Sequence, residues 1–262
     1  MAATAARLSV RGAGKRYGDL QAFADISFDV GRNSIVSIVG PSGCGKTTLL
    51  WSMSGLLALT SGQVLLEGSP ITGPHPEIGL VFQEANLLPW RNLIQNVLFP
   101  FEIKRQTPDR AWIDHLLDRC GLKGFEASAP RELSGGMQQR ASIVRALSLR
   151  PSVLLMDEPF GALDAFTRED MNRLLEEIFL ETQTTIVFIT HSIEEAIFLS
   201  DRVIVLTRRP GRVLADYAVP FARPRSIATM ASREVFDLQN RIKSDIYGQP
   251  GPIAQPAQGA VA

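Results

Sequence analysis

The sequence is poor in cysteine, has no excess of charge of either sign and contains no long hydrophobic run. Only two of its 262 residues are cysteines, Cys44 and Cys120, too few for a disulfide framework or a cysteine-based metal cluster. This scarcity is typical of a reducing compartment. Lys and Arg total 27, as do Asp and Glu, so the formal net charge is zero. Because a large nucleic-acid interface needs an excess of positive charge, we expect no nucleic acid among the partners.

Segments that would enter or cross a membrane are also missing. No run of about 18 or more apolar residues occurs, so we expect no membrane-spanning helix. Residues 1–11 are rich in Ala but lack a charged start followed by an apolar core, so we expect no export signal. The three histidines, His75, His115 and His191, are too scattered for their spacing to predict a metal site.

Short apolar runs alternate with helical patterns along much of the chain. The runs are rich in Val and Ile and bounded by Gly, Pro or Asp, and they cover residues 35–39, 78–82, 153–156, 186–190 and 203–206. Such runs are typical of strands that are covered on both faces. Between them, apolar residues at positions 171, 174, 175, 178 and 179 form one stripe of a helix. The alternation predicts a parallel α/β core.

Two segments depart from this alternation. Residues 85–149 hold helical patterns such as 110–119, several prolines and no convincing strand, which predicts a helical insertion. After Pro220, the spacing of Val235, Phe236, Leu238, Ile242 and Ile246 predicts a further helix, and residues from 248 onward have the composition of a disordered tail. We therefore expect a domain over residues 1–220, with a core at about 8–84 and 150–220 and a helical subdomain at about 85–149. A helical extension with a flexible tail would follow over 221–262.

A phosphate-binding motif follows the first apolar run. Eight residues fit the pattern G-x-x-x-x-G-K-[ST]: Gly40, Pro41, Ser42, Gly43, Cys44, Gly45, Lys46 and Thr47. The glycines let the backbone curl so that successive N–H groups point at phosphate oxygens. Lys46 is expected to reach the β- and γ-phosphates, and the Thr47 hydroxyl to bind Mg²⁺. A helix over 48–57, beginning with Thr48, would add partial positive charge at its N-terminus. The motif predicts ATP and Mg²⁺ as cofactors.

Two carboxylates close the apolar run at 153–156. Asp157 would hold Mg²⁺ through water at the strand end, as the second acidic element of P-loop enzymes does. Glu158 points in a different direction, so it can face the γ-phosphate and polarise an attacking water. The pair predicts ATP hydrolysis, with Lys46 and Glu158 among the catalytic residues.

A third motif begins another predicted helix, which runs to about residue 149. Ser134 is suited to cap its N-terminus, and Gly135 and Gly136 follow with free N–H groups. This run resembles the signature sequence of ATP-binding cassette proteins, although Met137 replaces the Gln that is most common there. Because the phosphate contacts come from Ser134 and the glycine backbone, we expect little loss. The resemblance covers roughly residues 8–219 and implies a RecA-like P-loop NTPase core with a mainly parallel sheet. It also implies antiparallel β elements near the N-terminus and an inserted helical subdomain.

The same resemblance assigns roles to four further residues. Tyr17 matches the aromatic residue that stacks on adenine, and Gln83 matches the glutamine that senses Mg²⁺ and the attacking water. Asp164 matches the aspartate of the loop that crosses the dimer interface. His191 matches the histidine that contacts the γ-phosphate. Glu158, His191, Gln83 and Lys46 are therefore the expected catalytic set, and Thr47, Gln83 and Asp157 the expected metal set.

The partners also follow from the resemblance. In this family, two ATPase domains pair head to tail, and the phosphate loop of one faces the signature of the other. One loop and one signature in this chain imply a homodimer with composite ATP sites. Separate transmembrane permease subunits would dock after Gln83, beside Leu87, Leu88 and Trp90, at the cytoplasmic face of the cell (inner) membrane. The alternative is that these three apolar residues only pack the insertion onto the core.

Short arginine- and tryptophan-containing runs at residues 87–91, 209–212 and 223–225 resemble importer ATPases of the nitrate, sulfonate and taurine group. That group implies an extracytoplasmic substrate-binding protein that acts through the permease. An exporter or lipid-trafficking ATPase, or a non-transport ATPase of the family, remains an alternative. DNA-repair members place a long coiled coil between phosphate loop and signature, whereas only 87 residues (47–133) lie between Lys46 and Ser134 here, without a heptad run.

Overall fold

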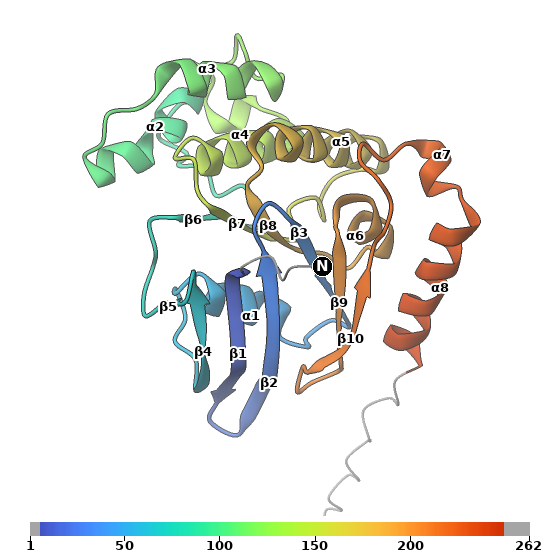
Figure 1. Cartoon of the computed structure of the whole chain (residues 1–262). Coiled ribbons are helices and arrows are strands. Elements are labelled where there is room, and N and C mark those ends of the chain that lie inside the picture. Colours follow the sequence, from blue (N-terminus) through green and yellow to red (C-terminus); the bar gives the residue numbers. More distant parts are fainter. Residues whose placement is uncertain (1–5, 249–262) are drawn as a thin grey trace, which may run out of the picture.

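The computed structural model describes residues 6–248, and the expected tail from residue 249 onward lies outside the described residues. The larger of two sheets has the strand order β10-β9-β3-β8-β7-β6 (Figure 1). Its strands are β3 (Ile35–Val39), β6 (Ile78–Val81), β7 (Val153–Asp157), β8 (Thr185–Ile189), β9 (Arg202–Leu206) and β10 (Val213–Ala218). Every pairing is parallel except that of β9 with β10. The predicted mainly parallel core is confirmed.

The three central strands β3, β7 and β8 are buried along their whole length because helices or the second sheet cover both faces. Along β7, Val153 and Leu155 belong to one apolar cluster, while Leu154 and Met156 belong to another on the opposite face. The strand is therefore apolar throughout until Asp157, where it ends. The carboxyl ends of β3, β6, β7, β8 and β9 lie along one edge of this sheet, because all five run parallel.

A second, antiparallel sheet has the order β2-β1-β4-β5. It consists of β1 (Ala6–Tyr17), β2 (Leu20–Gly31), β4 (Ser61–Leu66) and β5 (Ser69–Pro70). The expected antiparallel elements near the N-terminus are thus confirmed. Helix α1 (Lys46–Met53) packs between the sheets with Leu49, Leu50 and Met53 fully buried.

The sequence pattern placed this first helix at 48–57, and both bounds were wrong. Helix α1 begins at Lys46 and ends at Met53. It ends early because Gly55 adopts a left-handed conformation, with φ of 78°, and turns the chain away from the helix axis. A Cβ at Gly55 would lie 2.1 Å from the carbonyl oxygen of Gly73, so glycine is the residue that this contact permits.

The segment between β6 and β7 is helical, and none of its described residues forms a strand. It contains α2 (Leu93–Lys104), α3 (Arg110–Arg119), a 3-10 turn η1 (Pro130–Glu132) and α4 (Gly135–Leu147). The bounds of α3 are those predicted. Figure 1 shows these helices gathered at the top, away from the antiparallel sheet below. Their apolar side chains join those of β7 and β8 in one continuous core, which fixes the insertion to the large sheet.

Helices α5 (Ala165–Thr182), α6 (Ile193–Leu199), α7 (Ile227–Met230) and α8 (Arg233–Tyr247) complete the fold. Helix α8 buries Val235, Leu238, Ile242 and Ile246 against α6 and β9. Phe236 does not join them and is 60% exposed, because it lies one residue, about 100°, around the helix from Val235. No helix formed by residues 6–248 is both long and apolar enough to cross a membrane.

Candidate nucleotide-binding site

The loop between β3 and α1 has the shape that its glycines predict. Gly43 and Gly45 have φ of 73° and 98°, and a Cβ at Gly45 would lie 3.0 Å from the carbonyl oxygen of Ala22. Lys46 is only 7% exposed, and its Nζ donates to the carbonyl oxygens of Gly40 and Pro41 at 3.0 and 3.2 Å. The loop therefore bends back over its own lysine and holds the ammonium group in place.

Not every residue of the motif faces the space around which the loop curls. Cys44 is fully buried, and desolvation raises the pKa of its thiol. The carbonyl groups of Gly40 and Pro41 are turned toward Lys46. These three residues shape the loop, and any contact of Cys44 with a ligand is limited to its backbone.

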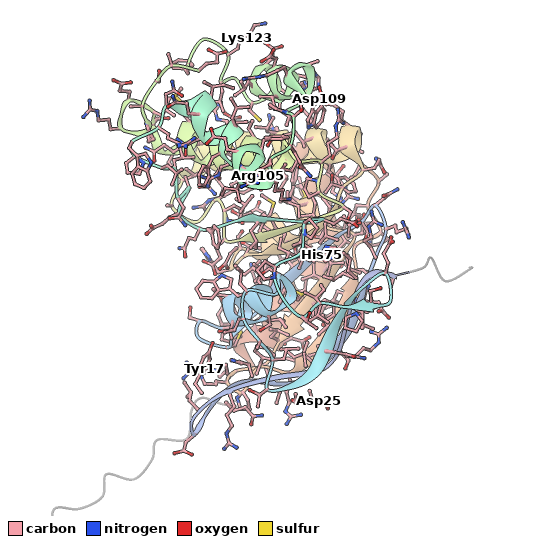
Figure 2. All side chains as sticks on the ribbon, turned by 90° about the vertical axis from the view of Figure 1, so that its left-hand side faces the viewer. Tyr17, Asp25, His75, Arg105, Asp109 and Lys123 are labelled. Atoms are coloured by element: carbon pink, nitrogen blue, oxygen red, sulfur yellow. The ribbon has the colours of Figure 1, made fainter. Side chains whose placement is uncertain are left out.

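A pocket of about 310 Å³ lies beside the loop. Ser42, Gly43, Gly45, Lys46, Thr47 and Thr48 form one side, and the rest is contributed by Tyr17, Leu20, Ala22, Glu158 and Arg209. Tyr17 is 47% exposed, and the Nζ of Lys15 lies 5.1 Å from the centre of its ring. Figure 2 shows Tyr17 at the end of the β1–β2 ribbon, far from Lys123 in the helical insertion. The pocket thus joins an aromatic ring, a row of backbone N–H donors, two cations and a carboxylate.

Asp157 and Thr47 meet at the carboxyl end of β7. The Thr47 hydroxyl donates to Asp157 Oδ1 at 3.1 Å, and Asp157 is 5% exposed. Burial raises the pKa of this carboxyl, and the charge of Glu158 raises it further, whereas Thr47 and Lys46 oppose the shift. No cluster of three or more His, Cys, Asp or Glu capable of holding a metal exists among residues 6–248. A hydroxyl and one carboxylate are, however, the donors that Mg²⁺ uses together with substrate phosphates.

Glu158 has an unusual backbone conformation for a residue with a Cβ. Its φ is 43°, and its N–H donates to the carbonyl oxygen of Ile189 at 2.9 Å, which ties it to the end of β8. Such left-handed conformations cost on the order of 1–3 kcal/mol and occur often at active sites. With this backbone conformation, the Glu158 side chain lines the pocket.

Two of the predicted catalytic side chains lie near Glu158. His191 Nδ1 is 3.2 Å from Glu158 Oε2, and a Cβ at Gly161 would lie 3.8 Å from both Glu158 Oε2 and Gln83 Nε2. The carboxyl ends of β6, β7 and β8 therefore bring Gln83, Glu158 and His191 together. Next to Gln83, the Phe82 carbonyl accepts a hydrogen bond from Gln139 of α4 at 3.1 Å. The arrangement suits a carboxylate that takes a proton from water and neighbours that orient it.

The signature residues lie at the start of α4 and are not part of the pocket lining. Ser134 caps this helix as predicted, accepting from the N–H of Met137 at 3.3 Å. Ser134 and Gly135 are exposed, whereas Gly136 is buried against α5: a Cβ there would lie 2.9 Å from Thr167 Cγ2. The start of α4 therefore lies directly beside the start of α5.

Asp164 caps α5 at this same surface. It accepts from the N–H groups of Phe166 and Thr167 at 3.1 Å and from the Thr167 hydroxyl at 2.6 Å. These bonds, that of the Thr167 hydroxyl first, lower the pKa of the Asp164 carboxyl. Ser134 and Asp164 thus present two adjacent helix N-termini to solvent.

Three residues of the pocket lining, Leu20, Ala22 and Arg209, were not predicted from the sequence, and Arg209 is the charged one. Its Nε donates to the Gly43 carbonyl oxygen at 3.0 Å. Its position places it in the pocket, because β9 pairs in parallel with β3. The segments that follow these two strands therefore lie side by side, and Arg209 comes next to the phosphate-binding loop. Strand order, which local sequence does not specify, was needed to see this.

Comparisons with known proteins point to one family. The family model described as ABC transporter matches residues 23–161. A taurine import ATP-binding protein of Roseobacter denitrificans is 49% identical over 206 residues, covering 78% of this chain and 76% of that protein. An uncharacterised ABC transporter ATP-binding protein of Methanocaldococcus jannaschii is 45% identical over 209 residues, covering 79% and 78% of the two chains.

Solved structures agree with these sequence matches. The dimeric structure of a bacterial ABC transporter cassette has a TM-score of 0.72 at 31% identity and covers 82% of this chain and 100% of that chain. The cbiO1 component of the cbiONQ transporter complex from Clostridium perfringens has a TM-score of 0.75 at 28% identity, covering 90% and 95%.

Proposed function

Since this chain is an ATPase of the ABC transporter family, we propose that it powers the import of a small sulfonate-type anion such as taurine through separate permease subunits. The observation that carries the ATPase role is the single pocket that joins Tyr17, the phosphate-binding loop and Glu158. The names of the taurine-import relatives support the choice of cargo. Nitrate or another small anion is the neighbouring choice within the same group.

Each wall of the pocket has a role in binding ATP under this proposal. Adenine stacks on the half-exposed Tyr17 ring, and the N–H groups of residues 42–48 bind the phosphates. Lys46 exchanges its bonds with the Gly40 and Pro41 carbonyls for bonds to phosphate oxygens. Thr47 and Asp157 would hold Mg²⁺, which would supply positive charge to neutralise the phosphates.

Hydrolysis needs a water placed in line with the γ-phosphate and a group that accepts its proton. Glu158 is placed for this role because its side chain enters the pocket beside Lys46. His191 and Gln83 lie near Glu158 and orient the water and the γ-phosphate. The strained backbone of Glu158 holds the carboxylate at the phosphate end of the pocket.

The exposed start of α4 supports a composite site in a head-to-tail homodimer. Ser134 and Gly135 lie beside Asp164 and face solvent within one chain. In the dimer these helix N-termini close over the ATP of the partner and add donors to the γ-phosphate. A second copy therefore completes each site, and closing on ATP followed by opening after hydrolysis supplies the mechanical stroke.

The helical subdomain at about 85–149 supplies the proposed permease docking surface. Trp90 is 76% exposed and therefore available to a permease. Leu87, in contrast, packs against the core, as expected of a residue that only holds the insertion in place. Asn96, which is buried, accepts from the Leu88 N–H at 2.7 Å and donates to the Leu88 carbonyl. The loop is thus rigid while its tryptophan is free to enter a partner. A permease at the inner membrane would place this chain on the cytoplasmic face, with a substrate-binding protein on the other side.

The test of the proposed function is a reconstituted complex of this chain with its permease and binding protein in lipid vesicles. We expect ATP hydrolysis that taurine stimulates and that is accompanied by accumulation of taurine on the side of the ATPase. Hydrolysis coupled to movement in the opposite direction would favour an exporter. Hydrolysis stimulated only by another anion would leave the importer role and change its cargo.

A further inference from the structure

The loop between β9 and β10 carries an arginine, Arg209, that has no part in the proposed hydrolysis. Residues 207–212 form this loop, and Arg209 lines the nucleotide pocket together with Tyr17 and the phosphate-binding loop. While its Nε donates to the Gly43 carbonyl at 3.0 Å, its Nη2 lies 3.0 Å from the place that a Cβ on Gly43 would occupy. The guanidinium group therefore lies directly against the phosphate-binding loop.

The backbone of this loop is fastened to the surroundings of the pocket. The Gly211 N–H donates to the Ala22 carbonyl at 3.1 Å, and the Gly211 carbonyl accepts from the Ala24 N–H at 2.9 Å. A Cβ at Gly211 would lie 2.2 Å from the Cys44 carbonyl oxygen, so the loop and the phosphate-binding loop are in direct contact. Only glycine permits this approach.

Side-chain bonds close the loop on itself. The Thr207 hydroxyl donates to the Pro210 carbonyl at 3.1 Å and accepts from the Arg212 N–H at 2.9 Å. Arg209 therefore extends from a loop backbone that is held independently of the side-chain bond to Gly43.

The charges around Arg209 indicate what it binds. Among the described residues, no carboxylate oxygen lies within 4.0 Å of its guanidinium nitrogens, and the same holds for Lys46. Two cations and a row of N–H donors thus face one pocket, and its one carboxylate, Glu158, lies nearest to His191 and forms no ion pair with either cation. Such an arrangement is stabilised by an anionic ligand, and a guanidinium fits phosphate oxygens with two parallel hydrogen bonds.

We infer that Arg209 is a nucleotide-binding residue, whose terminal Nη groups contact the phosphate chain of the nucleoside di- or triphosphate in this pocket. Its Nε keeps its bond to Gly43 and so holds the guanidinium plane in place. The inference rests on the proposed function, because it takes the pocket to be the ATP site.

The test compares Arg209→Gln and Arg209→Lys with Arg212→Gln, a matched control in the same loop that is exposed and outside the pocket lining. Affinity for ATP and ADP is measured by titration calorimetry at low and high salt, and Tm is measured without nucleotide. We expect Arg209→Gln to raise the Kd for ATP about tenfold, as loss of a charge-assisted contact does. Arg209→Lys should lose less, and Arg212→Gln should bind as the wild type does. The affinity of Arg209→Gln should also depend less on salt.

Two results would overturn the inference. One is that Arg209→Gln binds ATP within about twofold of the wild type. The other is a weaker affinity for ATP with unchanged salt dependence, together with a lower Tm in the absence of nucleotide. Arg209 would then only stabilise the phosphate-binding loop through its bond to Gly43. Failure of the proposed function would look different: the wild type itself would not bind ATP, or Lys46→Ala would bind it equally well.

Discussion

The two ends of the nucleotide-binding machinery are built in different ways. At the core end, Lys46 and Asp157 are almost fully buried and Glu158 holds a left-handed backbone. At the signature end, Ser134 and Asp164 are exposed, and each is bound to the first turn of its own helix. The core end thus combines buried charge with a strained backbone, whereas the signature end is exposed and has ordinary helix caps.

This difference indicates which end is complete within one chain. Buried charge and backbone strain persist only where the surrounding structure over-determines them, and the large sheet supplies that structure on both faces. Helix caps with exposed N–H groups need no such support and remain available to an anion brought by a partner. The core end is therefore pre-organised, whereas the signature end would become functional only in the proposed homodimer.

The largest effect is expected at the core end, from Glu158→Gln. This change keeps shape and hydrogen bonding but removes the carboxylate that we propose accepts the proton of water. Turnover should fall by about 10²-fold or more, in line with loss of a general base, while ATP binding persists. ATP hydrolysis and calorimetric binding measure the two quantities, and size-exclusion chromatography should detect a trapped ATP-bound dimer. Glu194→Gln, on the first turn of α6, is the matched control. Near-normal turnover in Glu158→Gln would exclude the assignment.

Mixing two inactive variants tests whether the core end of one chain works with the signature end of another. Lys46→Ala removes the cation of the core end, and Ser134→Arg blocks the signature end. In a random mixture half of the dimers carry one intact site, so recovery of up to about a quarter of wild-type hydrolysis is expected if the sites act independently. The measurement is hydrolysis of the mixture against each variant alone. No recovery at all would mean that one chain forms the site by itself.

A third prediction distinguishes a docking role of Trp90 from a packing role. Trp90→Ala should weaken association with the permease by about 2 kcal/mol or more, because it removes an aromatic side chain that would be buried in the permease interface. Its Tm should stay nearly unchanged, since the side chain is mostly exposed. Trp112 is the contrasting control: its Nε1 donates to the Leu147 carbonyl and Arg150 stacks on its ring, so Trp112→Ala should lower the Tm. A lower Tm for Trp90→Ala would return Trp90 to a packing role, and normal association with an unchanged Tm would contradict both readings.

Sequence alone predicted what depends on local pattern. The buried strands, the phosphate-binding loop and the cap at Ser134 follow from apolar runs, glycine spacing and a hydroxyl before a helix, and all three are present. Arg209 and the contact of Gly136 with Thr167 could not be predicted, because each depends on which distant segments become neighbours. The early end of α1 had a local signal in Gly55, but an apolar run past it outweighed that signal in the pattern.

The smallest expected effect concerns charge burial, and it has opposite signs at the two ends. The native pKa of Asp157 is raised mainly by desolvation, so the folded state holds the proton more tightly than the unfolded chain does. Ionised Asp157 therefore destabilises the fold above its native pKa, and this penalty disappears as the pH falls toward the unfolded value. Asp157→Asn should therefore raise Tm slightly at neutral pH, and the gain should shrink on acidification.

Asp164→Asn is the matched change at the signature end. The native pKa of Asp164 is lowered by its bonds to Thr167, so its charge stabilises the fold above the unfolded pKa and that stability is lost as the pH falls. Because Asn also caps helices well, the variant should lose only a little Tm at neutral pH, and the loss should vanish in acid. Thermal unfolding of both variants between neutral and acidic pH gives the two signs in one experiment. A lower Tm for Asp157→Asn at neutral pH would mean that its bond to Thr47 outweighs the cost of burying its charge, and the core end would then store no electrostatic strain.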